Sequence, residues 1–113
     1  MRIEISREQS NVVVSLHGKI TLNESGRDFF KRMNELFDDE IKGVILIDMS
    51  HIDYIDSTGL GELVGYLHRL REKGRQMVLI NPQKTIMNLI KLSNLDKIFP
   101  LFASIDEALR RTN

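Results

Sequence analysis

The sequence contains no cysteine, and this absence removes several kinds of chemistry at once. Without thiols the chain can form no disulfide scaffold, no thiolate metal site and no cysteine nucleophile. Charge of one sign is not in excess either, because 16 Lys and Arg residues balance 16 Asp and Glu residues. The net charge therefore favours neither a nucleic acid nor an acidic membrane as a partner.

Long apolar runs are also missing. The longest are far too short to span a bilayer, which requires roughly 20 apolar residues in a helix. Residues Met1 to Ile5 alternate apolar and charged side chains and show no apolar core of a signal peptide. We therefore expect a cytoplasmic protein without membrane insertion. Of the 113 residues 42% are apolar, which is enough for a core, and we expect one domain over residues 1–113.

The chain does contain an alternation of strand and helix patterns. Alternating apolar residues near both 3–5 and 12–16 predict an antiparallel hairpin, and continuous apolar runs at 44–47 and 77–80 predict buried strands. Apolar residues at helical spacing predict helices over 29–37, 60–70, 86–90 and 105–109. An apolar segment that is interrupted by charged residues and a proline predicts a short strand within 95–102. This order predicts an α/β sheet with parallel pairs and an antiparallel N-terminal hairpin.

Capping signals mark the ends of these helices. Thr21 and Glu24 fit a capping box before the first helix, with Asn23 as an alternative cap. A second box begins at Ser104, and Asn81 followed by Pro82 predicts the start of the third helix. Gly74 is placed to end the helix over 60–70.

The most informative stretch is 48–61, where a buried strand leads into a helix. Its motif is Asp56-Ser57-Thr58-Gly59-Leu60-Gly61. Serine is a preferred N-cap, so Ser57 can be explained as a cap alone. Two features favour a further role. Two hydroxyls adjoin where a cap needs one, and Gly59 and Gly61 leave the first turns bare although a helical glycine costs up to about 1 kcal/mol.

Catalytic and metal-binding patterns do not emerge. A serine hydrolase elbow requires glycine two positions before the serine, where this chain has Ile55, and the Gly-Lys-Ser/Thr ending of a phosphate loop is absent. The spacing of Asp48, Asp53 and Asp56 matches no calcium loop. Three histidines, none at the spacing of a metal motif, fall on different predicted elements: His17, His51 and His68.

The motif of residues 56–61, following Asp48 to Ile55, resembles the signature of the STAS domain, and most of all that of the bacterial anti-sigma factor antagonists, or anti-anti-sigma factors. Further likeness lies at 18–22, 79–82 and 92–99, so the resemblance covers nearly the whole chain. It implies a single α/β STAS domain with a small mixed sheet and helices packed mainly on one face.

The resemblance also implies a mechanism. In that family the dephosphorylated antagonist binds an anti-sigma factor that is also a serine kinase, and a sigma factor is released. The kinase phosphorylates the motif serine, here Ser57, and a serine phosphatase reverses the modification. The chain would be a phosphoprotein and not an enzyme, because ATP and Mg²⁺ belong to the kinase. We expect the partner-binding face to include Thr21, Asn23, Glu24, Asp53, Asp56, Ser57, Thr58, Gly59 and Gly61.

One position departs from the family pattern. Many members carry Asp where this chain has Thr21, so kinase recognition is expected to differ here. The resemblance leaves a second function open. STAS domains also occur as non-signalling subunits of membrane transport systems, and in such a protein Ser57 would serve only as a helix cap.

Overall fold

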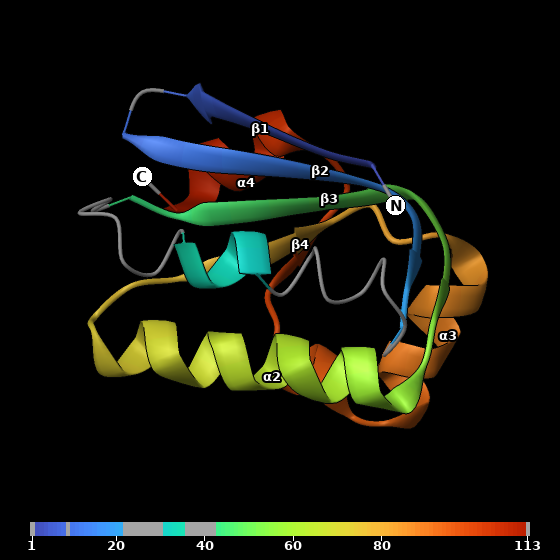
Figure 1. The fold of residues 1–113 in the computed structure, drawn as a ribbon. Helices are drawn as coiled ribbons and strands as arrows, with labels where there is room; N and C mark the ends of the chain where they lie inside the picture. The colour runs from blue at the N-terminus through green and yellow to red at the C-terminus, as the bar shows by residue number, and fades with distance from the viewer. Residues whose placement is uncertain (1, 9, 22–30, 36–42, 113) are drawn as a thin grey trace.

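The computed structural model describes residues 2–8, 10–21, 31–35 and 43–112 (Figure 1). Residues 31–35 are helical, and the structure contains the following further elements. In chain order they are β1 (Arg2–Glu8), β2 (Asn11–Ile20), β3 (Ile45–Ile55), α2 (Ser57–Glu72), β4 (Met77–Ile80), α3 (Lys84–Leu92), the 3₁₀ helix η1 (Leu95–Lys97), β5 (Leu101–Phe102) and α4 (Ile105–Thr112).

The strands form one sheet in the order β1-β2-β3-β4-β5. Strands β1 and β2 are antiparallel, and each later neighbour is parallel to the strand before it. Apolar residues of β2, β3 and β4 line up across the ladder in rows such as Val14, Ile47 and Leu79. The predicted mixed sheet with an N-terminal hairpin is therefore confirmed.

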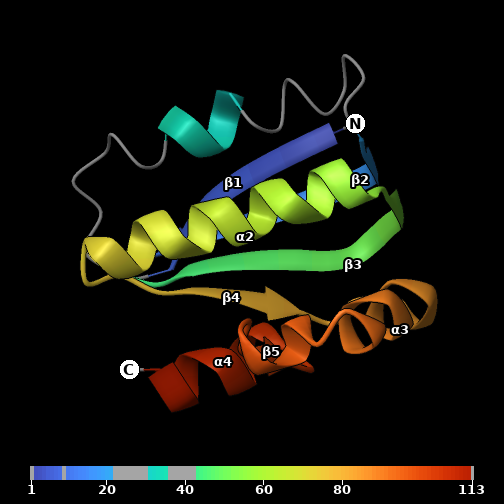
Figure 2. The ribbon, with the colours of Figure 1, turned by 90° about the horizontal axis from the view of Figure 1, so that it is seen from below.

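The two faces of the sheet are covered unequally (Figure 2). Helix α2 lies along one face, where Leu63 and Leu67 are buried in the larger core cluster together with Ile45 and Ile47. Helix α4 covers part of the other face, where Ala108 belongs to a smaller cluster. The prediction that helices pack mainly on one face is confirmed, since α3 also contributes to the larger cluster.

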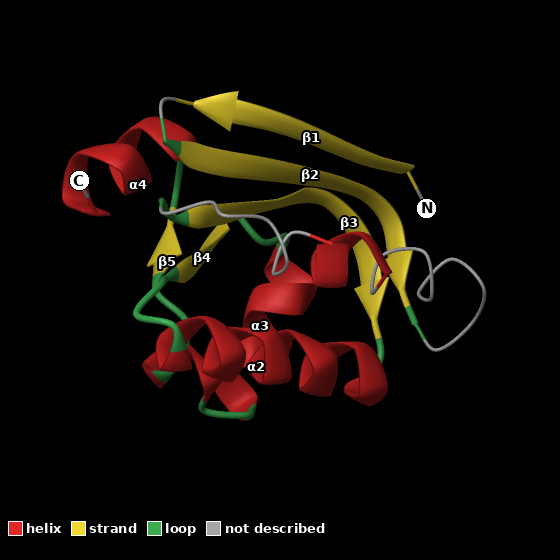
Figure 3. Ribbon diagram, turned by 60° about the vertical axis from the view of Figure 1, so that its left-hand side comes forward, coloured by secondary structure: helices red, strands yellow, loops and turns green. Residues whose placement is uncertain are grey.

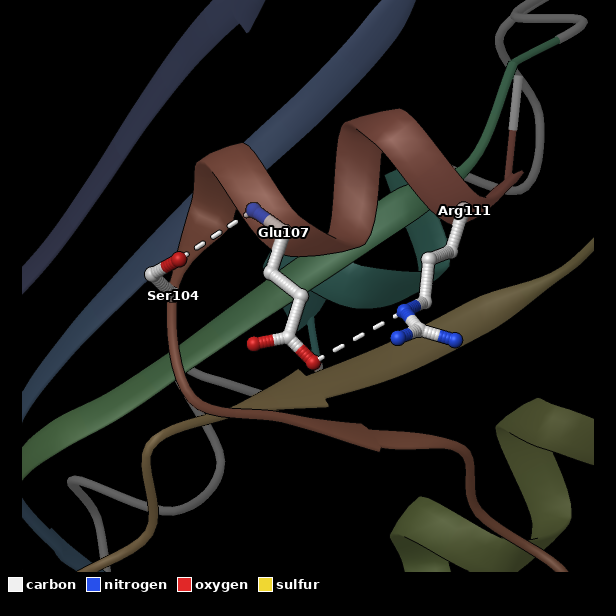
Figure 4. Close-up of polar contacts among 3 residues, drawn as sticks. All are labelled: Ser104, Glu107 and Arg111. Carbon is white, nitrogen blue, oxygen red and sulfur yellow. Dashed lines mark hydrogen bonds and ion pairs between the residues drawn. The ribbon is translucent and has the colours of Figure 1, made fainter.

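Two of the predicted helix ends are confirmed. The Ser104 hydroxyl accepts a hydrogen bond from the Glu107 amide at 3.1 Å, and Glu107 pairs with Arg111 one turn later (Figure 4). At the end of α2, Gly74 has a φ of 72°, the left-handed conformation that glycine adopts easily. The Arg75 amide donates to the Leu70 carbonyl at 2.7 Å, which completes a Schellman motif.

Other predicted boundaries are wrong or untested. The strand predicted over 44–47 does not end with its apolar run, because β3 stays paired with β2 as far as Ile55, across two register shifts. Helix α3 does not begin at Asn81-Pro82. Asn81 has a left-handed φ of 48° and its amide donates to the Phe102 carbonyl, so α3 starts at Lys84 with Gln83 as N-cap. Asn23 and Glu24 lie outside the described residues.

Candidate functional site

The junction of β3 and α2 presents Ser57 as the first residue of the helix and not as its cap. The N-cap is Asp56, whose Oδ1 accepts the Gly59 amide at 2.7 Å. A carboxylate is favoured here because it is charged and lies at the positive end of the helix dipole. The prediction that Ser57 caps α2 is therefore wrong, and the neighbouring acid takes that role.

The consequence for Ser57 is a free hydroxyl. Ser57 and Thr58 are both exposed. Within the part of the chain that the structure describes, the Ser57 hydroxyl makes no hydrogen bond. The amides of Ser57 and Thr58 belong to the first helical turn, where backbone donors have no partner inside the helix. Ser57 thus offers its oxygen to solvent next to available N–H groups.

Strand β2 holds this junction in place. Ile55 pairs with Ile20 in the sheet, and the Asp56 amide donates to the Ile20 carbonyl at 3.2 Å. Thr21 follows Ile20 directly, so it lies at the end of the sheet at which Asp56 lies. Its side chain is half-buried. Asp53 is exposed near the end of β3.

The two glycines of the motif have different environments. A Cβ atom at Gly59 would lie 2.7 Å from the Ile20 carbonyl oxygen and 2.8 Å from its Cγ2 atom. Gly59 is therefore needed for packing of α2 against β2, and it is buried. A Cβ atom at Gly61 would meet no described atom outside the local helix backbone within 4 Å. Only Gly61 of this pair is left without a packing reason inside the domain.

An open groove of about 580 Å³ begins beside Ser57. The elements that form it, the end of β3, the start of α2 and helix α3, lie at the same end of the molecule in Figure 1, and Figure 3 shows them from another side. The lining residues are Tyr54, Ile55, Asp56, Ser57, Leu60, Gly61, Val64, Leu89, Ser93 and Leu95. A second hollow of about 360 Å³ adjoins it through the shared residues Tyr54, Ile55 and Leu89, and its other lining residues are Asp53, Thr85 and Ile86.

The remaining polar candidates form a separate cluster. His17 and His51, on paired strands, stack with ring centroids 4.6 Å apart and an interplanar angle of 19°. The Ser50 hydroxyl lies 3.1 Å from Nδ1 of His51 and donates to Asp48 at 2.8 Å. Asp48 and Asp56 thus serve different local structures. Among the described residues no group of three or more His, Asp or Glu side chains could hold a metal ion.

The match to protein-family models is unambiguous. Residues 2–108 match the model described as the STAS domain. The chain belongs to the STAS family. A candidate anti-sigma factor antagonist of Thermotoga neapolitana is a STAS relative with 31% identity over 102 residues, which cover 88% of each chain.

Solved structures show the same STAS fold. The crystal structure of a candidate anti-sigma factor antagonist from Thermotoga maritima has a TM-score of 0.89 at 22% identity, covering 97% of this chain and 93% of that one. The phosphorylated form of the Bacillus cell fate determinant SpoIIAA has a TM-score of 0.76 at 18% identity, covering 99% and 100%. None of the described helices of this STAS chain is long and apolar enough to cross a membrane.

Sequence reasoning placed the motif residues but missed the groove beside them. Val64, Leu89 and Leu95 have the helical or apolar spacing of core residues, and nothing in that spacing shows which of them line a surface hollow. Tyr54 lies in the stretch 48–61 beside the motif residues, but its 52% exposure is a finding of the structure and has no signal in the sequence.

Proposed function

We propose that this chain is an anti-sigma factor antagonist that is controlled by phosphorylation of Ser57. Its dephosphorylated form binds an anti-sigma factor that is also a serine kinase, and the sigma factor held by that kinase is released. The proposal is supported by membership of the STAS family and by relatives that are named as anti-sigma factor antagonists. The kinase and a serine phosphatase are the direct partners, and the sigma factor is an indirect one.

The observation that carries the proposal is the free hydroxyl of Ser57. A kinase substrate has to present its acceptor oxygen to the kinase, whereas the side-chain oxygen of an N-cap serine accepts a hydrogen bond from a backbone amide of the helix. Because Asp56 caps α2 through a 2.7 Å hydrogen bond, Ser57 is exposed and uncommitted. The alternative function, a subunit of a transport system, explained Ser57 only as a helix cap. In the structure Asp56 is the cap, so this alternative no longer explains Ser57.

In the proposed reaction the Ser57 oxygen attacks the γ-phosphorus of Mg-ATP bound to the kinase. The hydroxyl proton passes to a base of the kinase, the bond to the β-phosphate oxygen breaks, and ADP leaves. The chain itself acts only as a substrate. The phosphatase restores the hydroxyl by hydrolysing the phosphate ester.

The new phosphate adds a charge of about −1.5 to −2 at pH 7. The amides at the start of α2 partly stabilise that charge, whereas the carboxylates of Asp53 and Asp56 add to the local negative field. Since Ser57 is exposed, the phosphate fits without rearrangement of the core. Binding is lost because the partner surface would have to desolvate this charge.

The experiment that tests the proposal is phosphorylation by candidate serine kinases in Mg-ATP, followed by mapping of the phosphate by mass spectrometry. We expect phosphate on Ser57 alone, full modification of Thr58→Ala, and no modification of Ser57→Ala. Phosphate on Thr58, or equal modification of both variants, would contradict the assignment. Thr21→Asp, which restores the acid common in the family, is expected to raise the phosphorylation rate.

A further inference from the structure

The groove beside Ser57 has a simple chemical character. Its walls are mainly apolar, and among the described residues the charged ones that line it and the adjoining hollow are Asp53 and Asp56. We call the two hollows together the α2–α3 groove. Asp56 already accepts the amide of Gly59, whereas Asp53 is exposed and makes no ion pair with another described residue. The groove therefore offers apolar contact and one uncommitted negative charge.

Gly61 leaves room for an occupant at the groove entrance. A glycine within a helix costs up to about 1 kcal/mol relative to alanine. Gly59 has a packing reason in its contact with Ile20, but Gly61 is exposed and open space lies where its Cβ would be. Gly61 lines the groove next to Ser57. Its missing side chain keeps the groove open at the end nearest the proposed phosphorylation site.

We propose that the α2–α3 groove binds an apolar segment of the partner kinase that carries a flanking Lys or Arg. This inference rests on the proposed function and names the chemistry of the partner. Apolar side chains of the segment would cover Tyr54, Val64 and Leu89, of which Tyr54 is 52% exposed in the free chain. The basic residue would pair with Asp53, because the described residues that line the groove carry negative charge and include no cation.

The same geometry explains how one phosphate could control docking. Ser57 lies at the rim of the groove, in the same lining as Gly61 and Val64. A phosphoserine there would hold a hydrated dianion at the entrance to an apolar surface. The docked segment would then have to remove water from that charge. Its own basic residue would not offset this cost, because it would lie beside Asp53 in the adjoining hollow.

The test uses two glycine variants that are closely matched. Gly61→Leu fills the groove entrance, while Gly65→Leu adds the same side chain one turn later, where a Cβ also meets no described atom and which does not line the groove. Both variants should be at least as stable as wild type, because each gains helix propensity. Against the kinase that modifies Ser57, we expect Gly61→Leu to weaken binding by at least about tenfold and Gly65→Leu by less than about twofold. Equal affinities of Gly61→Leu and wild type would overturn the proposal.

A second probe separates this inference from the proposed function. An amphipathic helical peptide of Leu and Lys is titrated into the full chain by NMR, with a Leu and Glu peptide of the same pattern as control. We expect shift changes at Tyr54, Val64 and Leu89 with the Lys peptide, weaker changes with the Glu peptide, and loss of both in Gly61→Leu. If no kinase binds wild type but the peptide results are as expected, the proposed function is wrong and the assignment of the groove as a binding site stands. Equal binding of the two peptides, shifts elsewhere, or self-association abolished by Gly61→Leu would overturn the groove assignment.

Discussion

At the scale of single residues, capping of α2 and presentation of a hydroxyl belong to two neighbouring residues, although the sequence pattern attributed both to Ser57. Asp56 begins the helix and Ser57 is left exposed. The distinction could not be read from the sequence, because Asp and Ser are about equally good N-caps and stand side by side. Their positions relative to the end of β3 decide it, since the Asp56 amide bonds to the Ile20 carbonyl and fixes where the helix can start.

The first prediction concerns Asp56. Asp56→Ala should lower the free energy of unfolding by about 0.5–2 kcal/mol, because the N-cap hydrogen bond is lost, whereas Asp56→Asn should keep most of it. In the alanine variant Ser57 becomes the next available cap, so its phosphorylation should slow. Denaturant melts and phosphorylation rates check both effects. If Asp56→Asn is phosphorylated as slowly as Asp56→Ala, the carboxylate acts through its charge and not as a cap.

The second prediction concerns Ser57. Ser57→Ala removes an exposed hydroxyl that makes no hydrogen bond to a described residue, so stability should change by less than about 0.5 kcal/mol. A urea melt beside wild type measures this. A loss as large as that of Asp56→Ala would mean that Ser57 shares the capping role after all.

The third prediction concerns Tyr66, a buried residue of α2 outside the site. Burial, with a smaller contribution from the Glu62 carboxylate, raises the pKa of Tyr66 to about 12 from its usual 10. The neutral phenol is favoured in the folded state, so its stabilising contribution is complete below pH 10 and is lost as the pH rises toward 12. Wild type should therefore lose more stability than Tyr66→Phe between pH 9 and 11. If the two proteins lose the same free energy of unfolding over this range, the raised pKa of Tyr66 is contradicted.

At the scale of elements, the order of strands and helices could be predicted because each has its own apolar periodicity. The extent of β3 could not. The apolar run that predicted this strand ends at residue 47, but β2 continues alongside and keeps the strand paired across two irregular steps. The start of α3 was hidden for a similar reason, because the Asn81 amide pairs with the end of β5.

The fourth prediction concerns the face of α2. Leu67 is buried against the sheet, so Leu67→Ala should lower the free energy of unfolding by about 2–5 kcal/mol. Leu92, on α3, is 84% exposed and serves as the control, since its truncation removes little buried area. Equal losses in denaturant melts of the two variants would mean that this face of α2 is wrongly placed.

At the scale of the whole molecule, the sheet and its helices act as a platform for one short surface. The motif itself is contiguous, so the sequence could place Asp56, Ser57 and Gly61 together. The groove combines the motif with Leu89 and Leu95, which lie 28 to 39 residues further along the chain, and only the packed sheet brings them beside it. Since the site lies outside the core, phosphorylation should change what the surface binds and leave the fold intact.

The central claim is that a phosphate on Ser57 ends partner binding. The most direct test is a binding titration of wild type and Ser57→Ala with the partner kinase, each with and without Mg-ATP. Both proteins should bind without Mg-ATP. On addition of Mg-ATP, wild type should be released while Ser57→Ala stays bound. Identical responses of the two proteins to Mg-ATP would contradict the account.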